Sequence, residues 1–156
     1  MQKVPLSRRT LIGACAAAPA AAIPASADAQ AGATLSPKME ELVRRNYAAW
    51  EAKDWPRLDS LLADDFTFSS AAPDDHISKA AFKTQCWDTQ SPLIGAFDLL
   101  HVYGSGDEAF ALYVCRTRNG KTFRNVEYLR ARNGKLVAIE CYFGGAGYPS
   151  AADSQH

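Results

Sequence analysis

Residues 108–143 read EAFALYVCRTRNGKTFRNVEYLRARNGKLVAIECYF. Two Asn-Gly pairs, Asn119-Gly120 and Asn133-Gly134, divide this stretch into three runs in which apolar and polar residues alternate. An Asn-Gly pair between alternating runs is a strong signal for a β-hairpin with a two-residue loop. The stretch therefore predicts three consecutive antiparallel strands, over Glu108–Arg118, Lys121–Arg132 and Lys135–Phe143.

A fourth strand and three helices are predicted upstream. Phe97–Tyr103 alternates in the same way and ends at the turn residues Gly104–Asp107. Before Pro92 the periodicity is helical, and Ser36 and Pro37 together are typical of a helix start. Helices are predicted over Pro37–Ala52, from Trp55 through Leu62, and over Lys79–Trp87, with a short strand at Phe66–Ser69. This order predicts an α+β fold, with three N-terminal helices packed on a curved, mostly antiparallel sheet.

The Asn-Gly loops also predict which residues lie opposite each other, provided that each loop contains two residues. Counting outward from Asn133-Gly134 pairs Glu127 with Glu140. Like charges directly opposite each other destabilise a sheet, and burial adds to that cost. At least one carboxyl would then have a raised pKa, which is typical of functional sites. Two plainer interpretations stay open: Arg116 or Arg124 neutralises the pair, or the register is off by one.

Candidate site residues lie on the sheet face that this register turns toward the helices. Glu127, Glu140 and His101 are candidate catalytic residues, because carboxyl and imidazole groups can exchange protons with a ligand. His101 can equally be a hydrogen-bonded core residue. Candidate ligand-binding residues come from this face and from the first helix: Tyr47, Trp50, Asn125, Tyr142, Phe110 and Leu112.

The opposite sheet face is also substantially apolar, with Val126, Tyr128 and Ile139 among its residues. An antiparallel sheet covered by helices on one side normally exposes a polar face on the other. We therefore expect a homodimer through this outer face. The cysteines that follow the leader, Cys86, Cys115 and Cys141, have no metal-binding spacing and are expected to be buried thiols. No metal and no cofactor are predicted.

Residues 1–29 resemble a twin-arginine export signal. Arg8-Arg9 precedes an alanine-rich apolar run, Thr10–Ala22, and Ala27-Asp28-Ala29 has the small-x-small pattern of a cleavage site. The apolar run is too short for a membrane span, which needs roughly 20 residues. A Sec signal that happens to carry two arginines is the alternative. Either route predicts a periplasmic or secreted protein that begins near Gln30, with a linker over 30–36, one domain over 37–147 and a loose tail over 148–156.

The charge balance excludes two classes of partner. Cleavage after residue 29 removes Lys3, Arg8, Arg9 and Asp28, which leaves 14 basic and 16 acidic residues and a formal charge of −2. No basic patch favours nucleic acid, and no membrane association is expected once the signal is removed.

Several motifs together resemble the nuclear-transport-factor-2-like superfamily, and its SnoaL-like group of polyketide cyclases and ketosteroid isomerase relatives in particular. They are Tyr47-Ala48-Ala49-Trp50, Leu61–Phe68, Asn133-Gly134-Lys135-Leu136 and the final Tyr142-Phe143. The resemblance implies a cone, a cystatin-like α+β barrel, with a mostly apolar pocket between the sheet and the first helix. Enzymes of this group do proton chemistry next to a carbonyl and need no cofactor.

The resemblance also implies roles for individual residues. His101 and Glu127 lie on strands where cyclase relatives hold acid and base groups, and Tyr47 lies where isomerase relatives hold an oxyanion-stabilising tyrosine. Three functions stay open. The chain binds a small hydrophobic, carbonyl-type ligand in its pocket; or it is a cofactor-independent isomerase or cyclase; or it is a dimeric interaction protein without a cavity.

Overall fold

The computed structural model describes residues 34–70 and 75–143. The predicted export signal, most of the predicted linker and the predicted tail over 148–156 lie outside the described residues. In the described part of the chain, no helix is long and apolar enough to cross a membrane.

Helix α1 (Pro37–Ala52) has the bounds that the sequence predicts. The Ser36 hydroxyl accepts a hydrogen bond from the Met39 amide at 3.1 Å, which caps the first turn. Lys53 ends the helix in a left-handed conformation, with φ of 58°. Helix α2 (Trp55–Leu61) follows at once, capped by the Asp54 carboxylate.

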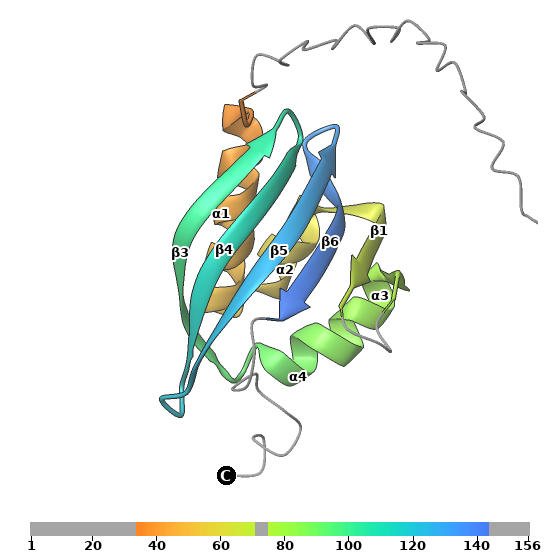
Figure 1. Cartoon of the computed structure of the whole chain (residues 1–156). Helices are drawn as coiled ribbons and strands as arrows, with labels where there is room; N and C mark the ends of the chain where they lie inside the picture. The colour runs from red at the N-terminus through yellow and green to blue at the C-terminus, as the bar shows by residue number, and fades with distance from the viewer. Residues whose placement is uncertain (1–33, 71–74, 144–156) are drawn as a thin grey trace, which may run out of the picture.

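The third predicted helix is longer than expected and contains a π-helical turn. Helix α3 (Lys79–Phe82) continues through the π-turn η1 (Lys83–Trp87) into α4 (Asp88–Gln90), and the three form one continuous rod in Figure 1. A π-turn inserts one extra residue into a helix, so it changes which side chains face inward afterwards. Here Cys86 and Trp87 are buried.

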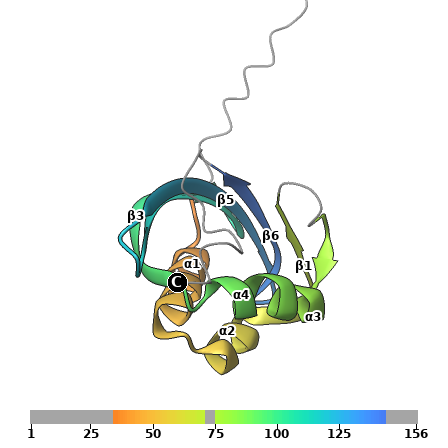
Figure 2. The same ribbon diagram turned by 90° about the horizontal axis from the view of Figure 1, so that it is seen from below.

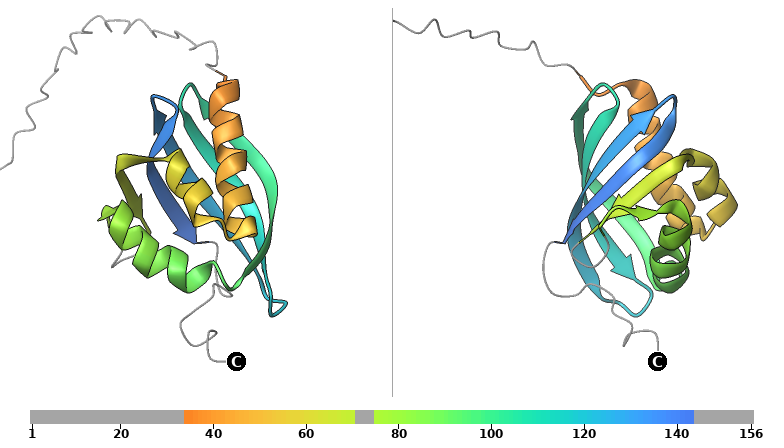
Figure 3. Two further views of the ribbon diagram at one scale, coloured as in Figure 1. Left: turned by 180° about the vertical axis from the view of Figure 1, so that it is seen from behind. Right: turned by 90° about the vertical axis from the view of Figure 1, so that its right-hand side faces the viewer.

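In the described part of the chain, six strands form one mixed sheet in the order β2-β1-β6-β5-β4-β3. They are β1 (Leu62–Ser69), β2 (Ile77–Ser78), β3 (Ile94–Ser105), β4 (Glu108–Thr117), β5 (Thr122–Arg132) and β6 (Lys135–Phe143). Strands β1 and β6 run parallel, and the other neighbours run antiparallel. The sheet curves around α1, as Figure 2 shows from below, and the helices cover its concave face in both views of Figure 3. The predicted α+β fold class is confirmed.

The β4–β5 register differs from the prediction by one residue. Cys115 lies opposite Phe123 and Tyr113 opposite Asn125, because three residues rather than two separate the last paired residues, Thr117 and Lys121. Gly120 adopts φ of 83° to close this longer loop. The consequence is that Tyr113 and Cys115 face the helices, and that Phe110 and Leu112 face outward.

The β5–β6 register is also shifted, and the predicted Glu127–Glu140 pair does not exist. The two-residue turn at Asn133-Gly134 is as predicted, since Arg132 lies opposite Lys135. One extra residue, Val137, is then accommodated in β6 between the partners of Ala131 and Arg130. Beyond this bulge Glu127 lies opposite Cys141.

The β3–β4 hairpin has a tighter turn than expected. Ser105 lies opposite Glu108, so the loop holds two residues instead of four. This two-residue difference places His101 opposite Leu112 rather than Phe110. A separate irregularity between Leu99 and His101 then changes the register for the rest of β3, where Leu99 lies opposite Tyr113.

The hydrophobic core fills the space between the helices and the concave face. Its members come from every layer, and several have no accessible surface: Val43, Ala49, Leu58, Leu62, Ala109, Ala111, Cys115, Leu129 and Leu136. As expected, Cys86, Cys115 and Cys141 are buried thiols rather than disulfides.

Candidate functional site

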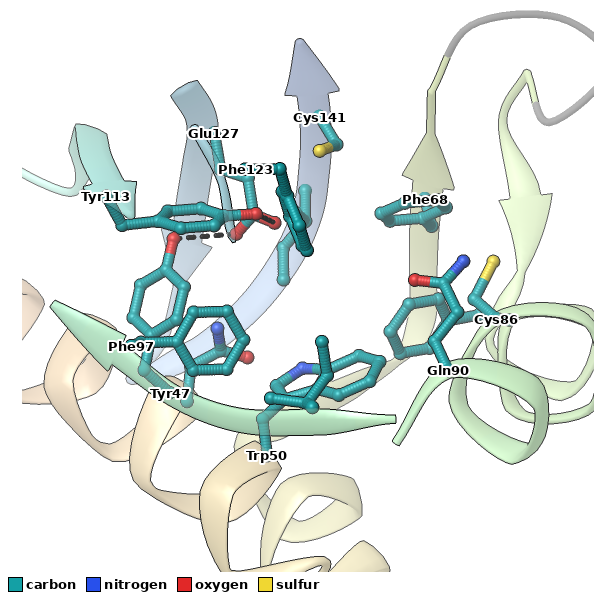
Figure 4. Close-up of a pocket in the computed structure, with 14 residues that line it drawn as sticks. Tyr47, Trp50, Phe68, Cys86, Gln90, Phe97, Tyr113, Phe123, Glu127 and Cys141 are labelled. Carbon is teal, nitrogen blue, oxygen red and sulfur yellow. Dashed lines mark hydrogen bonds between the residues drawn. The ribbon is translucent and has the colours of Figure 1, made fainter. Parts of the chain in front are cut away.

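A cavity lies between α1, the rod formed by α3, η1 and α4, and the concave face of the sheet (Figure 4). Its walls are mostly apolar and largely aromatic. They consist of Asn46, Tyr47, Trp50, Phe68, Phe82, Cys86, Gln90, Ile94, Phe97, Tyr113, Phe123, Glu127, Ile139 and Cys141. The cavity volume is about 40 Å³. An apolar cavity of about 150 Å³ holds benzene, so this one admits only a molecule of a few heavy atoms as it stands.

Glu127 is the one carboxyl group among the residues that line this cavity. Its Oε2 accepts a hydrogen bond from the Tyr47 hydroxyl at 2.7 Å, and its Oε1 accepts one from the Tyr113 hydroxyl at 3.0 Å. Figure 4 shows both rings converging on the carboxyl group from α1 and from β4. In the described residues, no lysine, arginine or histidine forms an ion pair with it.

Burial raises the pKa of Glu127 above its ordinary value of 4.5. Protein atoms surround the carboxyl group, which disfavours its charged form, and the hydrogen bonds from Tyr47, Tyr113 and Cys141 offset only part of this effect. Burial, followed by the nearby Glu127 charge, also raises the pKa of both tyrosines well above 10.0. Both phenols therefore stay protonated as donors near neutral pH.

A second layer of contacts positions Tyr113. Asn125 is buried, and its Nδ2 donates to the Tyr113 hydroxyl at 3.2 Å and to the Cys141 sulfur at 3.5 Å. The Tyr47 ring packs against Phe97 and Tyr113 with centroid separations of 5.1 and 5.2 Å. The orientation of the two phenols is therefore set by packing as well as by the carboxyl group.

The structure brings only some of the predicted site residues together. Glu127, Tyr47 and Trp50 line the cavity, and Asn125 supports Tyr113 behind its wall. Glu140 lies on the outer face, where its carboxylate accepts from the Tyr142 hydroxyl at 2.8 Å. The prediction that Glu140 and Tyr142 share a pocket with Glu127 is wrong, because the bulge at Val137 inverts the outer half of β6.

His101, Phe110 and Leu112 also lie outside the cavity, contrary to the prediction. His101 is exposed and stacks on Tyr103 with a centroid separation of 5.4 Å. Phe110 is 51% exposed. The one-residue shift between β4 and β5 places Phe110 and Leu112 on the outer face, and His101 shares that face because it lies opposite Leu112.

Sequence reasoning missed Tyr113, Asn46 and Gln90 as cavity residues. The two-residue loop predicted at Asn119-Gly120 would place Tyr113 on the outer face. A signal was present, because Thr117 and Asn119 can bond to each other, and here their side chains do so at 2.6 Å. Asn46 was detectable as a polar residue on the apolar face of α1, three positions after Val43 and four before Trp50.

The described residues contain no group of three or more His, Cys, Asp or Glu side chains placed to hold a metal ion. The carboxyl and phenol groups at the cavity can form hydrogen bonds to a polar group of a small molecule, and the carboxyl can give up or accept a proton. A carboxyl with a raised pKa lies next to two phenol donors at the edge of an apolar space.

The profile of the SnoaL-like domain matches residues 43–139, which is more than half of the chain. The chain belongs to the SnoaL-like family. A comparison with curated protein sequences gives no match.

Solved structures share the SnoaL-like architecture at low sequence identity. An NTF2-like protein of unknown function from Mesorhizobium loti is 24% identical with a TM-score of 0.59, over 72% of this chain and 99% of that one. A candidate ketosteroid isomerase from Kribbella flavida is 15% identical with a TM-score of 0.60, over 72% and 82%. An LEH-like epoxide hydrolase from M. tuberculosis is 14% identical with a TM-score of 0.58, over 68% and 84%. These likenesses support the fold, which hosts unrelated activities, and leave function to the site.

Proposed function

We propose that this SnoaL-like protein binds a small, mostly apolar carbonyl compound in the cavity beside Glu127. One observation carries the proposal: a half-buried carboxyl, without a basic partner among the described residues, is held by two tyrosines at the edge of an apolar space. A carboxyl group that keeps its proton can donate a hydrogen bond to a ligand carbonyl. The aromatic walls would hold the rest of the molecule, and the single polar point would orient it.

Titration with acetone, followed through the NMR signals of the full chain, tests this binding. We expect saturable shifts for cavity residues such as Tyr47 and Phe97. Ile94→Phe fills the cavity and should abolish them, whereas Leu112→Phe adds a ring on the outer face and should not. Shifts that do not saturate, or that persist in Ile94→Phe, contradict the proposal.

A second candidate is proton transfer without a cofactor, as in an isomerase or cyclase. The raised pKa of Glu127 favours it, because a carboxyl with a pKa nearer the working pH is a better acid and base. Ionised Glu127 would take a proton from the carbon next to the ligand carbonyl, a tyrosine hydroxyl would bond to the enolate oxygen, and the same carboxyl would return the proton.

Exchange of acetone protons in D₂O tests this chemistry directly. An enzyme of this type would exchange them about 10²-fold faster or more than its Glu127→Gln variant. Glu140→Gln makes the same chemical change on the outer face and should exchange as the parent does. Equal rates in the parent and in Glu127→Gln would exclude proton transfer by this residue.

We also propose that the protein is exported and acts outside the cytoplasm. The Arg8-Arg9 pair and the Ala27-Asp28-Ala29 pattern support this proposal. Replacing both arginines by lysine should block export by the twin-arginine route. Continued export would indicate the Sec route instead.

A further inference from the structure

The amide oxygen of Asn46 is a buried acceptor that nothing in the described structure satisfies. Asn46 lies on α1, is 1% exposed and lines the same cavity as Glu127. Its Oδ1 has no hydrogen-bond partner among residues 34–70 and 75–143. Buried polar groups are nearly always paired in folded proteins, so an unpaired one needs an explanation.

The sequence around Asn46 makes this position unusual. Its neighbours on the inner face of α1 are the buried Val43 and Tyr47, and Trp50 packs beside them. A leucine would suit this face, because it forms helices more readily and has no polar atom to satisfy. An asparagine here lowers the stability of the folded chain unless something bonds to it.

The polar groups of the described residues around the cavity form no hydrogen bond to Asn46 Oδ1. The hydroxyls of Tyr47 and Tyr113 already donate to Glu127. Because the terminal torsion of an asparagine is soft, a small rotation of the amide turns Oδ1 toward a molecule in the cavity.

We infer that Asn46 Oδ1 accepts a hydrogen bond from the ligand, which therefore carries an O–H or N–H donor as well as a carbonyl. This inference rests on the proposed function and narrows it to small hydroxy ketones or primary amides. The ligand carbonyl accepts a hydrogen bond from the protonated Glu127 carboxyl, and the ligand donor bonds to Asn46 Oδ1. A cavity of about 40 Å³ limits the molecule to a few heavy atoms.

Acetone and acetamide form the decisive pair of probes, because they have the same size and shape and differ only by a methyl group in place of an amino group. Their dissociation constants are measured by NMR titration of the full chain and of its Asn46→Leu variant. For each protein we take the ratio of the acetamide and acetone dissociation constants. Comparing this ratio between the two proteins cancels the different hydration of the two probes.

We expect the preference for acetamide over acetone to fall by about 5- to 10-fold in Asn46→Leu, since one buried hydrogen bond is worth about that factor. Hydroxyacetone should show the same fall. In the parent protein, the side-chain amide signal of Asn46 should shift more with acetamide than with acetone, which tests the contact even if the variant does not fold.

The inference is overturned if the ratio of the two dissociation constants is the same in the parent and in Asn46→Leu and the Asn46 amide signal responds to acetamide no more than to acetone. The proposed function would then still stand. The same result is expected if an internal water occupies Oδ1 permanently. If acetone, acetamide and hydroxyacetone all fail to bind, the proposed function itself fails.

Discussion

At the scale of single residues, the Glu127 carboxyl lowers the stability of the folded protein. Its burial costs free energy that the two tyrosine hydrogen bonds recover only in part, since the pKa stays raised. A glutamine of the same shape could bond to both phenols without carrying a charge. A costly group that lines a cavity indicates a functional role.

Glu127→Gln should therefore stabilise the protein in a pH-dependent manner. The folded state keeps the Glu127 proton at pH values where the unfolded chain has released it, so the parent loses stability as the pH rises from about 4.5 through the folded-state pKa. Each unit by which the pKa is raised corresponds to about 1.4 kcal/mol. Urea unfolding at several pH values should show the two proteins converging below pH 4.5 and the variant gaining above it.

Glu140→Gln is the matched control, because Glu140 also accepts from a tyrosine hydroxyl but on the outer face. It should give no comparable gain. A Glu127→Gln variant that is less stable than the parent at every pH would show that the charged carboxylate stabilises the fold.

At the scale of elements, strand β6 explains both what the sequence could predict and what it could not. Its bounds, and the turn at Asn133-Gly134, follow from local residues and were predicted correctly. The bulge at Val137 was not predictable, because it depends on the parallel partner β1, which pairs Leu62 with Leu136 and Thr67 with Ala138. The sequence does carry one sign that simple alternation fails there: Leu136–Ile139 are four consecutive apolar residues, and all four are buried.

For the candidate site, too, local sequence patterns predicted single residues but not their partners on neighbouring strands. Tyr47 and Trp50 follow from helical periodicity, and Glu127 follows from alternation within β5, which no turn disturbs. The partners of Glu127 depend instead on registers between strands. One residue of error in a loop or a bulge turns every later side chain to the other face.

Deleting Val137 should disrupt the sheet. Without the extra residue β6 would keep its pairs with β5, with Glu127 still opposite Cys141, but it would lose the bulge around which β1 pairs Leu62 with Leu136 and Thr67 with Ala138. Val137→Ala removes the side chain and keeps the bulge, so it should cost only about 1–2 kcal/mol. Urea unfolding should find the deletion variant unfolded or far less stable than Val137→Ala, and equal stabilities would contradict the role of the bulge.

At the scale of the whole molecule, the sheet presents an exposed aromatic patch on its convex side. It consists of Tyr103, Phe110, Tyr128 and Tyr142, of which Tyr103, Phe110 and Tyr142 are 67%, 51% and 55% exposed. Tyr103, Phe110 and Tyr128 lie in one row across three strands. We propose that this aromatic patch pairs with the same patch of a second copy, since large exposed apolar patches are typical of interfaces.

Phe110→Asp should weaken the dimer at least about 30-fold, as expected for a buried aromatic anchor at an interface. Sedimentation equilibrium of the full chain measures the change. Lys38→Asp, on the exposed surface of α1, is the control and should leave the dimer intact. A parent protein that is monomeric at about 100 μM would contradict the proposal.

The central claim is that Glu127 is a proton-holding group in a ligand cavity, and its carboxyl carbon reports this directly. We would titrate the ¹³C signal of the Glu127 carboxyl in the full chain, assigned by its loss in Glu127→Gln. We expect a pKa above 4.5. A pKa at or below 4.5 would contradict it, because the carboxyl would then be an ordinary charged acceptor for two tyrosines.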